Sequence, residues 1–284
     1  MKLTASIVTY RTPLDELGKC LESLRRDDVC RIYVIDNSPE DSLRTFITSH
    51  PAGDIVEYVD SHDNPGYGAA HNIALRRAIE ESTSYHLVIN SDVYFDRGVL
   101  PGIVEYMDRH PDIGLLQPRI ISPDGSEQFS SRLLPTPLDL IGRRFLPGFL
   151  SGPRNRRYLL ADRPAGATLN IPYHQGSFMF FRVDVLSKAG LFDERFFMYP
   201  EDIDITRRIH ALSPTIYWPG VTVTHAHRAS SYHNLRMLRI HAVNIIRYFN
   251  KWGWFYDRSR RYFNQRLLKE IATMTRQAEQ GQIE

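Results

Sequence analysis

The chain has 284 residues, of which 42% are hydrophobic and 24% charged, and its net charge is +2. This composition suffices for a substantial core in one large domain or two small ones. A charge so near neutrality gives no reason to expect a nucleic-acid partner. No apolar run approaches the roughly 20 residues that span a bilayer, and residues 1–10 do not read as a signal peptide. We therefore expect a cytoplasmic protein, attached at most peripherally to the inner face of the plasma membrane.

The cysteine content agrees with this compartment. The chain has 2 cysteines, Cys20 and Cys30, which form neither a disulfide framework nor a metal signature. A reducing cytoplasm fits such a pair best. A bridge between the two and a pair of separate buried thiols both remain open.

The first half of the chain alternates strand and helix patterns. Strands are predicted at 3–10, 31–36, 55–59 and 85–90, and helices at 14–24, near 41–49 and at 68–82. Such alternation indicates an α/β fold with a mostly parallel central sheet that is flanked by helices.

The second half is less regular. A turn at Asp124-Gly125 separates two short β segments, and residues 133–172, rich in Pro, Gly and Arg, read as a long surface loop. A strand at 176–181, a helix at 183–189 and a helix at 201–211 opened by Pro200 follow. Two strands at 215–218 and 221–227, broken by Pro219-Gly220, precede a helical C-terminal region that begins at Tyr232.

Polar side chains gather where three predicted strands end, which in α/β sheets is where ligands bind. The clusters are Thr9-Tyr10, Asp36-Asn37-Ser38 and Asn90-Ser91-Asp92. Asp92 is placed as a ligand of Mg²⁺ or Mn²⁺ would be, although Asn and Asp also close ordinary turns. Asp36 can accept the N3–H of uracil or thymine, or simply cap the next helix.

Three further segments are candidates for chemistry. Residues 64–72 (Asn-Pro-Gly-Tyr-Gly-Ala-Ala-His-Asn) combine glycines with a helix N-terminus, which favours a diphosphate but also suits a plain turn. Residues 192–204 place Glu201, Asp202 and Asp204 in the first turn of a helix behind an aromatic run, where capping and an Asp204–Arg208 pair are the simpler explanation. His225 and His227 face one side of a strand, as metal or diphosphate contacts or as structural histidines.

Taken in order, these segments resemble the family 2 glycosyltransferases, and within them bacterial rhamnosyltransferases of cell-surface polysaccharide synthesis. The similarity spans roughly residues 3–255. The matching pieces are Ser-Ile-Val-Thr-Tyr at 6–10, Ile-Asp-Asn-Ser at 35–38, the 64–72 segment, Asn-Ser-Asp-Val at 90–93, Gln-Gly-Ser-Phe-Met at 175–179, Phe-Asp-Glu-Arg-Phe-Phe-Met-Tyr at 192–199, Glu-Asp-Ile-Asp at 201–204, and His225 with Ser230 and Ser231.

The resemblance implies a GT-A fold with a catalytic domain at 1–230, divided into a nucleotide-binding half (about 1–118) and an acceptor half (about 119–230). A C-terminal helical extension would occupy 231–284. It also implies a nucleoside-diphosphate sugar donor (dTDP or UDP) and a glycan or polyprenyl-diphosphate-linked acceptor.

Site roles follow from the same resemblance. Thr9 and Tyr10 would cradle the base and Asp36 would pair with it, while Asn64, Gly68 and Asn72 line the nucleotide. Asp92 and His225 would hold a divalent cation, Mg²⁺ or Mn²⁺, and Asp202 would be the general base. Here the metal motif is Asn-Ser-Asp and offers a single carboxylate. Further expected substrate contacts are Asn37, Gly66, Asn90, Gln175, Gly176, Ser177 and Glu201.

The expected chemistry is a single displacement with inversion at the anomeric carbon. Charge that grows on the departing diphosphate is stabilised by the cation and backbone N–H groups, while the base activates the acceptor hydroxyl. Aromatic walls from Phe196, Phe197 and Tyr199 would exclude water.

Several alternatives remain open at this stage. A sugar-nucleotide pyrophosphorylase would carry a Gly-rich loop after the first strand, where this chain has Tyr10-Arg-Thr-Pro. A non-catalytic carbohydrate- or membrane-binding protein would not need Asp92 and Asp202 together. Rhamnose from dTDP-rhamnose is the best guess for the donor, with UDP-galactofuranose, UDP-glucose or a UDP-N-acetylhexosamine as alternatives.

The C-terminal region allows two interpretations. Its arginines and aromatics suit an anionic membrane surface that presents a lipid-linked acceptor, and they equally suit helices that pack their aromatics on the catalytic domain. The residues concerned are Arg236, Arg239, Arg247, Lys251, Arg258, Arg260, Arg261 and Arg266, with Tyr248, Phe249, Trp252, Trp254, Phe255, Tyr256, Tyr262 and Phe263. The arginines of the 133–172 loop (Arg143, Arg144, Arg154, Arg156, Arg157, Arg163) would extend a positive rim.

Overall fold

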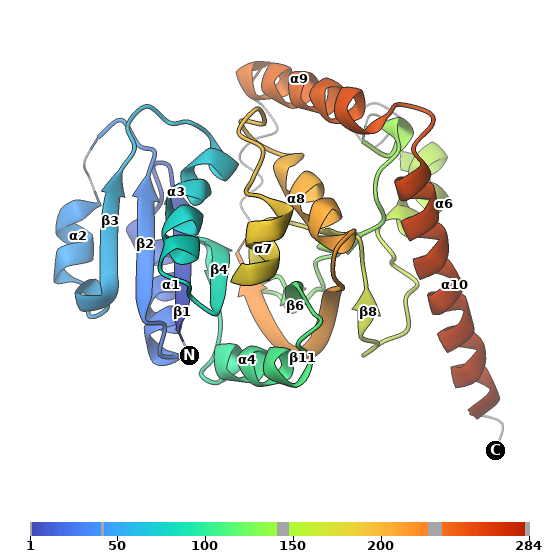
Figure 1. The fold of residues 1–284 in the computed structure, drawn as a ribbon, viewed down its shortest axis with the longest axis horizontal. Coiled ribbons are helices and arrows are strands. Elements are labelled where there is room, and N and C mark those ends of the chain that lie inside the picture. The colour runs from blue at the N-terminus through green and yellow to red at the C-terminus, as the bar shows by residue number, and fades with distance from the viewer. Residues whose placement is uncertain (1, 41–42, 141–147, 227–234, 282–284) are drawn as a thin grey trace.

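The computed structural model describes residues 2–40, 43–140, 148–226 and 235–281. A central sheet has the strand order β3-β2-β1-β4-β10-β6-β11-β5, with β8 (Leu169–Asn170) paired to β11. Helices flank this sheet, so the predicted α/β class is confirmed (Figure 1). A separate pair, β7 (Ser131–Arg132) and β9 (Tyr173–His174), lies off the sheet.

The N-terminal half matches the predicted alternation closely. Its strands β1 (Leu3–Thr9), β2 (Arg31–Asp36), β3 (Val56–Asp60) and β4 (Tyr85–Asn90) pair in parallel. Its helices are α1 (Leu14–Arg26), α2 (Arg44–Ser49) and α3 (Tyr67–Glu80), with the short 3₁₀ turn η1 (Gly53–Ile55). Parallel strands must be joined by crossovers, and the amphipathic helices supply them.

The other half adds strands of both directions. β10 (Phe178–Arg182) runs antiparallel between β4 and β6 (Leu115–Ile121), and β11 (Thr215–His225) is parallel to β6. β5 (Val93–Tyr94) pairs with the end of β11. The helices are α4 (Val99–Arg109), α6 (Gly148–Tyr158), α7 (Val183–Ala189) and α8 (Glu201–His210).

Two expectations for this half were wrong. Residues 133–172 are not a surface loop, because they contain α6 and β8, and Leu134, Leu160 and Ile171 are buried in the core. The strands predicted on either side of Pro219-Gly220 form a single strand, β11, whose register shifts between Trp218 and Thr222. A bulge of this kind lets proline sit in a strand without a ladder hydrogen bond.

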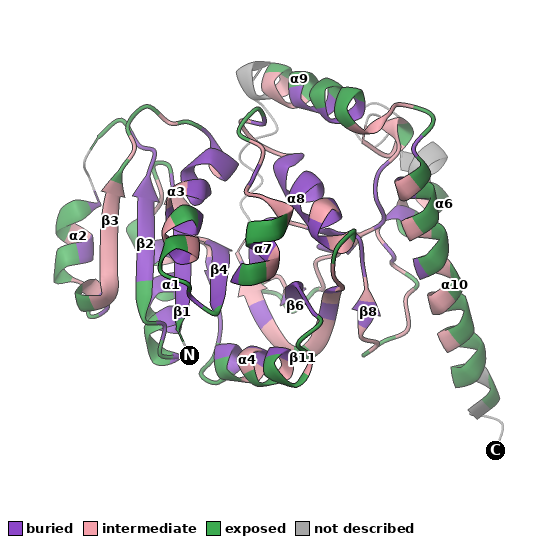
Figure 2. Ribbon diagram, viewed as in Figure 1, coloured by how far each residue is buried: buried purple, intermediate pink, exposed green. Residues whose placement is uncertain are grey.

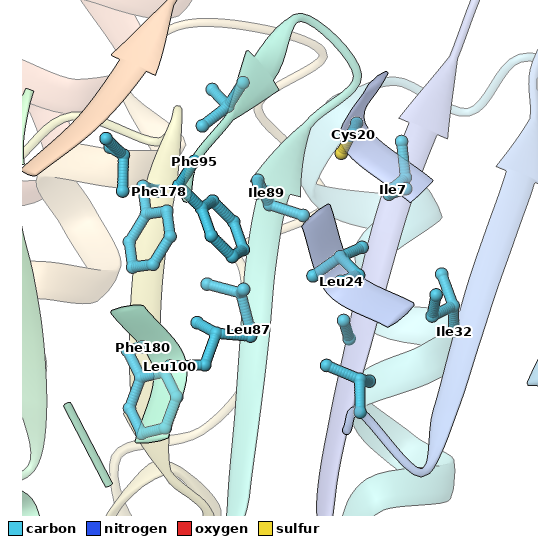
Figure 3. Close-up of a cluster of buried hydrophobic side chains, with 14 of the residues drawn as sticks. Ile7, Cys20, Leu24, Ile32, Leu87, Ile89, Phe95, Leu100, Phe178 and Phe180 are labelled. Carbon is cyan, nitrogen blue, oxygen red and sulfur yellow. The ribbon is translucent and has the colours of Figure 1, made fainter. Parts of the chain in front are cut away.

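The main core lies between the N-terminal strands and the helices beside them. Figure 3 shows Ile7, Leu24, Leu87, Ile89 and Phe178 converging from β1, α1, β4 and β10. Cys20 is buried in this cluster, whereas Cys30 is exposed, and both thiols are free. The expected burial therefore holds for Cys20 alone, and no disulfide joins the pair.

Two long helices form the C-terminal region, as expected. α9 (Leu235–Trp252) crosses the end of the molecule toward which β2 and β3 point, and α10 (Arg258–Gly281) runs away from it (Figure 1). Both pack on the chain through a second hydrophobic cluster that includes Phe196, Ile203, Tyr248, Phe249 and Leu267. Much of α10 is exposed, whereas most of α8, which lies below α9 in this view, is buried (Figure 2).

Candidate active site

The carboxyl ends of β1, β2 and β4 lie side by side. The parallel register pairs Thr9 with Asp36 and Val8 with Asn90. The polar clusters that the sequence places at these strand ends therefore meet at one edge of the sheet, where α/β folds bind ligands.

Asp36 is fully buried at this edge, and both of its carboxylate oxygens accept hydrogen bonds. Oδ1 accepts from the Thr9 hydroxyl and the Ser38 N–H, both at 3.0 Å, and Oδ2 accepts from the Tyr58 hydroxyl at 2.9 Å. Asp36 does not cap the next helix, because α2 has Leu43 as its N-cap and no side-chain cap; the pairing of Asp36 with a base remains a prediction. Tyr10, by contrast, is exposed.

The glycines of the 64–72 segment permit a close approach to the acidic segment. Gly66 has φ +101°, and a Cβ there would lie 2.3 Å from the Phe197 carbonyl oxygen. A Cβ on Gly68 would lie 2.8 Å from the Cβ of Phe192. Any other residue would push the two segments apart, so glycine is required by packing at both positions.

The two asparagines of the same segment have local partners. The Asn72 amide donates to the carbonyl oxygen of Phe192 at 2.9 Å and accepts from its N–H at 3.0 Å. Asn64 has φ +44° and donates its N–H to the Ser61 carbonyl in a turn. Asn72 therefore holds the acidic segment in place, and a nucleotide contact by either asparagine remains a prediction.

Tyr67 links three parts of the site. Its hydroxyl lies 3.1 Å from Asn90 Oδ1 and 2.7 Å from the Gly176 carbonyl oxygen. Gly176 in turn donates its N–H to Asp202 Oδ2 at 3.1 Å. One aromatic side chain thus brings together the end of β4, the turn before β10 and the start of α8.

Asp202 is buried at the start of α8 and is held in a fixed orientation. Its Oδ1 accepts the Ile203 N–H at 2.7 Å, and the Tyr173 hydroxyl lies 3.5 Å from Oδ2. Burial raises the pKa of Asp202 to about 6, although the N–H groups of Gly176 and Ile203 and the charge of Arg132 act in the opposite direction. A carboxylate with this pKa is ionised at neutral pH yet basic enough to accept a proton.

Glu201 precedes it and is also buried. Burial, reinforced by the charge of Asp202, raises the pKa of Glu201 well above its usual value. Its Oε2 has no hydrogen-bond partner among the described residues. Two carboxyls this close favour a single negative charge over two.

Asp92 and His225 face each other across the β5–β11 pairing. The distance from Asp92 Oδ1 to His225 Nε2 is 3.3 Å. The Gln128 amide N–H donates to the His225 carbonyl at 2.8 Å, which directs Gln128 Oε1 to His225 Nδ1 at 2.8 Å. Since Oε1 can only accept, Nδ1 carries the hydrogen and Nε2 points toward the carboxylate. A positive charge beside both atoms, a proton or a divalent cation, would satisfy this arrangement.

These two residues fit a cation only in part. Among the described residues, no group of three or more His, Cys, Asp and Glu side chains is placed to hold a metal ion. The protein thus supplies two candidate ligands, and a donor diphosphate would have to supply others.

Two more site candidates carry buried polar atoms that lack an internal partner. Within the described ranges, neither Asn37 Oδ1 nor Ser177 Oγ has a hydrogen-bond partner. Ser177 lies beside Asn90, whose N–H it accepts at 3.0 Å through its carbonyl. Buried polar groups are normally paired, so these atoms are available to a water or a ligand, and the substrate contacts expected of Asn37 and Ser177 remain predictions.

Other predicted features have structural roles or lie outside the described part of the chain. Phe196 is buried in the second hydrophobic cluster, and the ring of Tyr199 packs on His241 of α9 at 4.4 Å. Asp204 pairs with Arg208 at 2.9 Å, as the simpler interpretation expected. His227, Ser230, Ser231, Arg143 and Arg144 fall outside the described residues.

The sequence did not single out four residues that shape the site: Tyr67, Gln128, Arg132 and Tyr173. Tyr67 lies within the 64–72 segment, so its position in that segment is the sequence feature that could have indicated it. The other three come from β7, β9 and the turn before them, and only the tertiary fold brings them to Asp202 and His225.

Comparison with known proteins identifies the family of the chain. The pattern described as "Glycosyl transferase family 2" matches residues 4–190. The chain belongs to glycosyltransferase family 2. This glycosyltransferase is 30% identical over 242 residues to the N-acetylglucosaminyl-diphospho-decaprenol L-rhamnosyltransferase of Mycobacterium tuberculosis, covering 79% of this chain and 75% of that protein. It is 25% identical to the rhamnosyltransferase WbbL of Escherichia coli, covering 82% of this chain and 88% of WbbL.

Solved structures establish the GT-A fold. GalNAc-T7, crystallised with UDP, GalNAc and Mn²⁺, superposes with a TM-score of 0.65 at 14% identity, over 88% of this chain and 48% of that one. The mannosyltransferase PcManGT of Pyrobaculum calidifontis, in complex with GDP-Man and Mn²⁺, gives 0.55 at 20% identity, over 87% and 64%. The glycosyltransferase thus spans about half of GalNAc-T7 and just under two thirds of PcManGT. Both of these neighbours were crystallised with Mn²⁺.

Proposed function

We propose that this enzyme is an inverting glycosyltransferase that moves a sugar, L-rhamnose from dTDP-rhamnose, to a glycan or polyprenyl-diphosphate-linked acceptor in cell-surface polysaccharide synthesis. The M. tuberculosis relative is named for rhamnose transfer to a decaprenol diphosphate sugar, and WbbL is also named a rhamnosyltransferase. The observation that carries the proposal is the buried carboxylate of Asp202, which the N–H groups of Gly176 and Ile203 hold in place and which Gly176 and Tyr67 connect to Asn90 at the strand edge.

The proposed base removes the proton of the acceptor hydroxyl. The hydrogen bonds from Gly176 and Ile203 fix the Asp202 carboxylate, so little reorganisation precedes proton transfer. Glu201, with its unpaired Oε2, is placed to contact the acceptor from the same helical turn. Attack from this side and departure of the diphosphate from the other invert the anomeric configuration.

The departing diphosphate is proposed to lie at the strand edge near Asp92 and His225. These two residues would hold Mg²⁺ or Mn²⁺, which when bound stabilises the negative charge that grows on the diphosphate. Thr9, Asp36 and Asn37 are proposed to contact the base of the nucleotide.

A donor screen tests the proposal. The protein is incubated with dTDP-rhamnose or with UDP-galactofuranose, UDP-glucose and UDP-N-acetylhexosamines, with Mn²⁺ and a lipid-linked N-acetylglucosaminyl diphosphate acceptor, and nucleotide release is measured. We expect release from dTDP-rhamnose that depends on the acceptor. Transfer from a UDP-sugar instead would keep the enzyme class and reject rhamnose, and binding without turnover would favour a carbohydrate-binding protein.

We further propose that α9 and the start of α10 contact an anionic membrane surface. The structure sorts the aromatics of this region into two sets. Tyr248, Phe249 and Trp252 pack in the second hydrophobic cluster, whereas Phe255 is 92%, Tyr256 73% and Tyr262 59% exposed. The packing interpretation therefore holds for the first set and leaves the second without a core role.

The basic side chains of α9 and the start of α10 also support contact with an anionic membrane. The exposed side chains of this stretch include Arg239, Arg247, Arg258, Arg261, Arg266 and Lys269, while the acid among them, Asp257, is buried. Each basic residue near an anionic surface contributes about 1 kcal/mol, and aromatic rings prefer the interface. No helix in the described part of the chain is long and apolar enough to cross a membrane. Attachment would therefore rest on this surface.

Liposome co-sedimentation separates the two explanations. The variant Phe255→Ser/Tyr256→Ser should lose binding to anionic vesicles, while Leu212→Ser, which changes an exposed residue elsewhere, should not. Neutral vesicles should bind neither protein. Equal, negligible sedimentation of the wild type with both vesicle types would reject the membrane surface.

A further inference from the structure

Arg132 lies beside the proposed base without being part of the predicted site. It ends β7 and is paired directly with Tyr173 of β9, so both side chains project from the same face of this two-stranded sheet. The guanidinium carbon lies 5.8 Å from the Tyr173 ring centroid. Its Nε donates to the Phe129 carbonyl at 2.7 Å, which fixes the plane of the group.

Two short paths connect this guanidinium to Asp202. On the first, Arg132 Nη2 donates to Gln175 Oε1 at 3.2 Å, and the next residue, Gly176, donates its N–H to Asp202 Oδ2. On the second, the Tyr173 hydroxyl under the guanidinium lies 3.5 Å from the same Oδ2. Arg132 thus braces the turn whose backbone N–H orients the carboxylate.

The charges around Asp202 give this contact a second consequence. Asp202 is surrounded by the Glu201 carboxyl of its own helix, the Tyr67 hydroxyl of α3 and the Tyr173 hydroxyl of β9. The side chains around Asp202 are otherwise acidic or neutral. Arg132 from β7 adds a positive charge to them, and this charge lowers the pKa of Asp202. A nearby opposite charge favours the ionised form of a carboxyl group and so lowers its pKa.

We propose that Arg132 is a positioning residue for the base: it braces the 173–176 turn against Asp202 and places a positive charge beside the carboxylate. The inference rests on the proposed role of Asp202. It assigns two separable effects to one side chain, because the charge of Arg132 acts on ionisation while its planar group acts on geometry.

The two effects predict different pH profiles. In Arg132→Gln the charge is lost, so the acid limb of the kcat profile should move to higher pH by about one unit. Turnover at pH 6 should then fall by about fivefold more than turnover at pH 9, because the carboxylate of the wild type is already half protonated at pH 6. In Arg132→Lys the charge remains, but the planar group that bonds both Gln175 and the Phe129 carbonyl is lost, so the limb should stay in place while the plateau falls.

Steady-state turnover between pH 5.5 and 9 tests the inference, with Arg119→Gln as the control. Arg119 is an exposed arginine of β6 that pairs with Glu127 and should leave the profile unchanged. A pH-independent loss in Arg132→Gln, or a wild-type plateau in Arg132→Lys, would overturn the proposal. If Arg132→Gln does not fold, the plateau of Arg132→Lys alone tests the proposal.

Asp202→Asn, measured in the same experiment, separates the proposed role of Arg132 from the proposed role of Asp202 as the base. Loss of turnover in Asp202→Asn together with an unshifted Arg132→Gln profile would reject the role of Arg132 and keep the base. Near-normal turnover in Asp202→Asn would reject the base itself.

Discussion

Glu201, Asp202 and Asp204 stand within one turn of α8, yet their surroundings differ. Asp204 is fully buried and accepts hydrogen bonds from Arg208 and from the Trp252 indole at 2.8 Å, with Lys251 at 2.6 Å. Asp202 instead meets backbone N–H groups and faces the strand edge. The sequence pattern predicted the acidic first turn of α8. It could not predict which of the three carboxyls is structural, because the side chains that contact them come from β7, β9 and α9.

The first prediction concerns the base. Asp202→Asn keeps the size of the side chain but cannot accept a proton, so turnover should fall by roughly 10²-fold or more. Donor binding, measured by calorimetry, should barely change. Asp184→Asn on the exposed face of α7 serves as the matched control and should retain full turnover.

The second prediction concerns the cation. Asp92→Ala removes the carboxylate that faces His225, so Mn²⁺-dependent donor affinity should weaken by at least about tenfold. Circular dichroism should show an unchanged fold. Equal donor binding and transfer by the wild type in EDTA and in Mn²⁺ would show that Asp92 has another role.

At the scale of elements, a buried polar chain joins β1, β4 and α3. His86 contacts Thr4 at 2.8 Å and Ser6 at 2.9 Å, and Ser6 also contacts His71 at 2.7 Å. Burial lowers the pKa of His86 to about 3. The imidazole is therefore neutral in the folded protein throughout the range in which it becomes charged in the unfolded chain.

This difference predicts a pH-dependent stability. Below pH 6.5, the pKa of His86 in the unfolded chain, the unfolded chain binds a proton at this residue. Folded His86 does not bind that proton until about pH 3, so the free energy of unfolding decreases as the pH falls from 6.5 to 3. The slope contributed is about 1.4 kcal/mol per pH unit. Urea unfolding of His86→Gln between pH 7 and 4 should show a shallower slope than the wild type, whatever its absolute stability. An identical slope would mean that other groups dominate.

The C-terminal helices are fastened to α8 by a buried ion pair. Arg207 Nη2 lies 2.5 Å from Asp257 Oδ1, and the guanidinium carbon lies 4.0 Å from the Trp252 ring centroid. Lys251 and Asn244 of α9 also bind Asp193 and the Met198 carbonyl, at 2.8 and 2.9 Å, within the acidic segment. We therefore propose that the extension at 231–284 folds with the catalytic part at 1–230 as one unit.

The ion pair allows this proposal to be tested. Arg207→Met leaves Asp257 buried without its partner and should lower the free energy of unfolding by about 3–5 kcal/mol. The double variant Arg207→Met/Asp257→Leu should recover much of the loss. Additive losses in urea unfolding would mean that the pair does not couple α8 to the extension.

For the whole molecule, the parts that followed from sequence share a physical basis. β1, β2, β4 and α7 have local hydrophobic patterns and clear turn residues, and their bounds differ little from expectation. The 133–172 region was misread because its Pro, Gly and Arg content is typical of loops, whereas Leu134, Leu160 and Ile171 are buried by contact with distant elements. β11 was split because Pro219 suggested a break that a bulge absorbs.

The site shows the same division. The sequence predicted that polar residues at the ends of three strands lie together, because each follows directly on a buried strand, and the structure brings these strand ends side by side. The sequence did not predict Gln128, Arg132 and Tyr173, because the short strands β7 and β9 and the segment before β7 place them, and no local sequence pattern indicates this placement. Their roles depend on long-range packing, which a single sequence does not reveal.

The anomeric configuration of the product tests the central claim most directly. After transfer from dTDP-rhamnose to a lipid-linked N-acetylglucosaminyl diphosphate, NMR of the product gives the configuration of the new linkage. A single displacement assisted by Asp202 predicts the configuration opposite to that of the donor. Retention of the donor configuration would contradict both the single displacement and the role of Asp202 as general base.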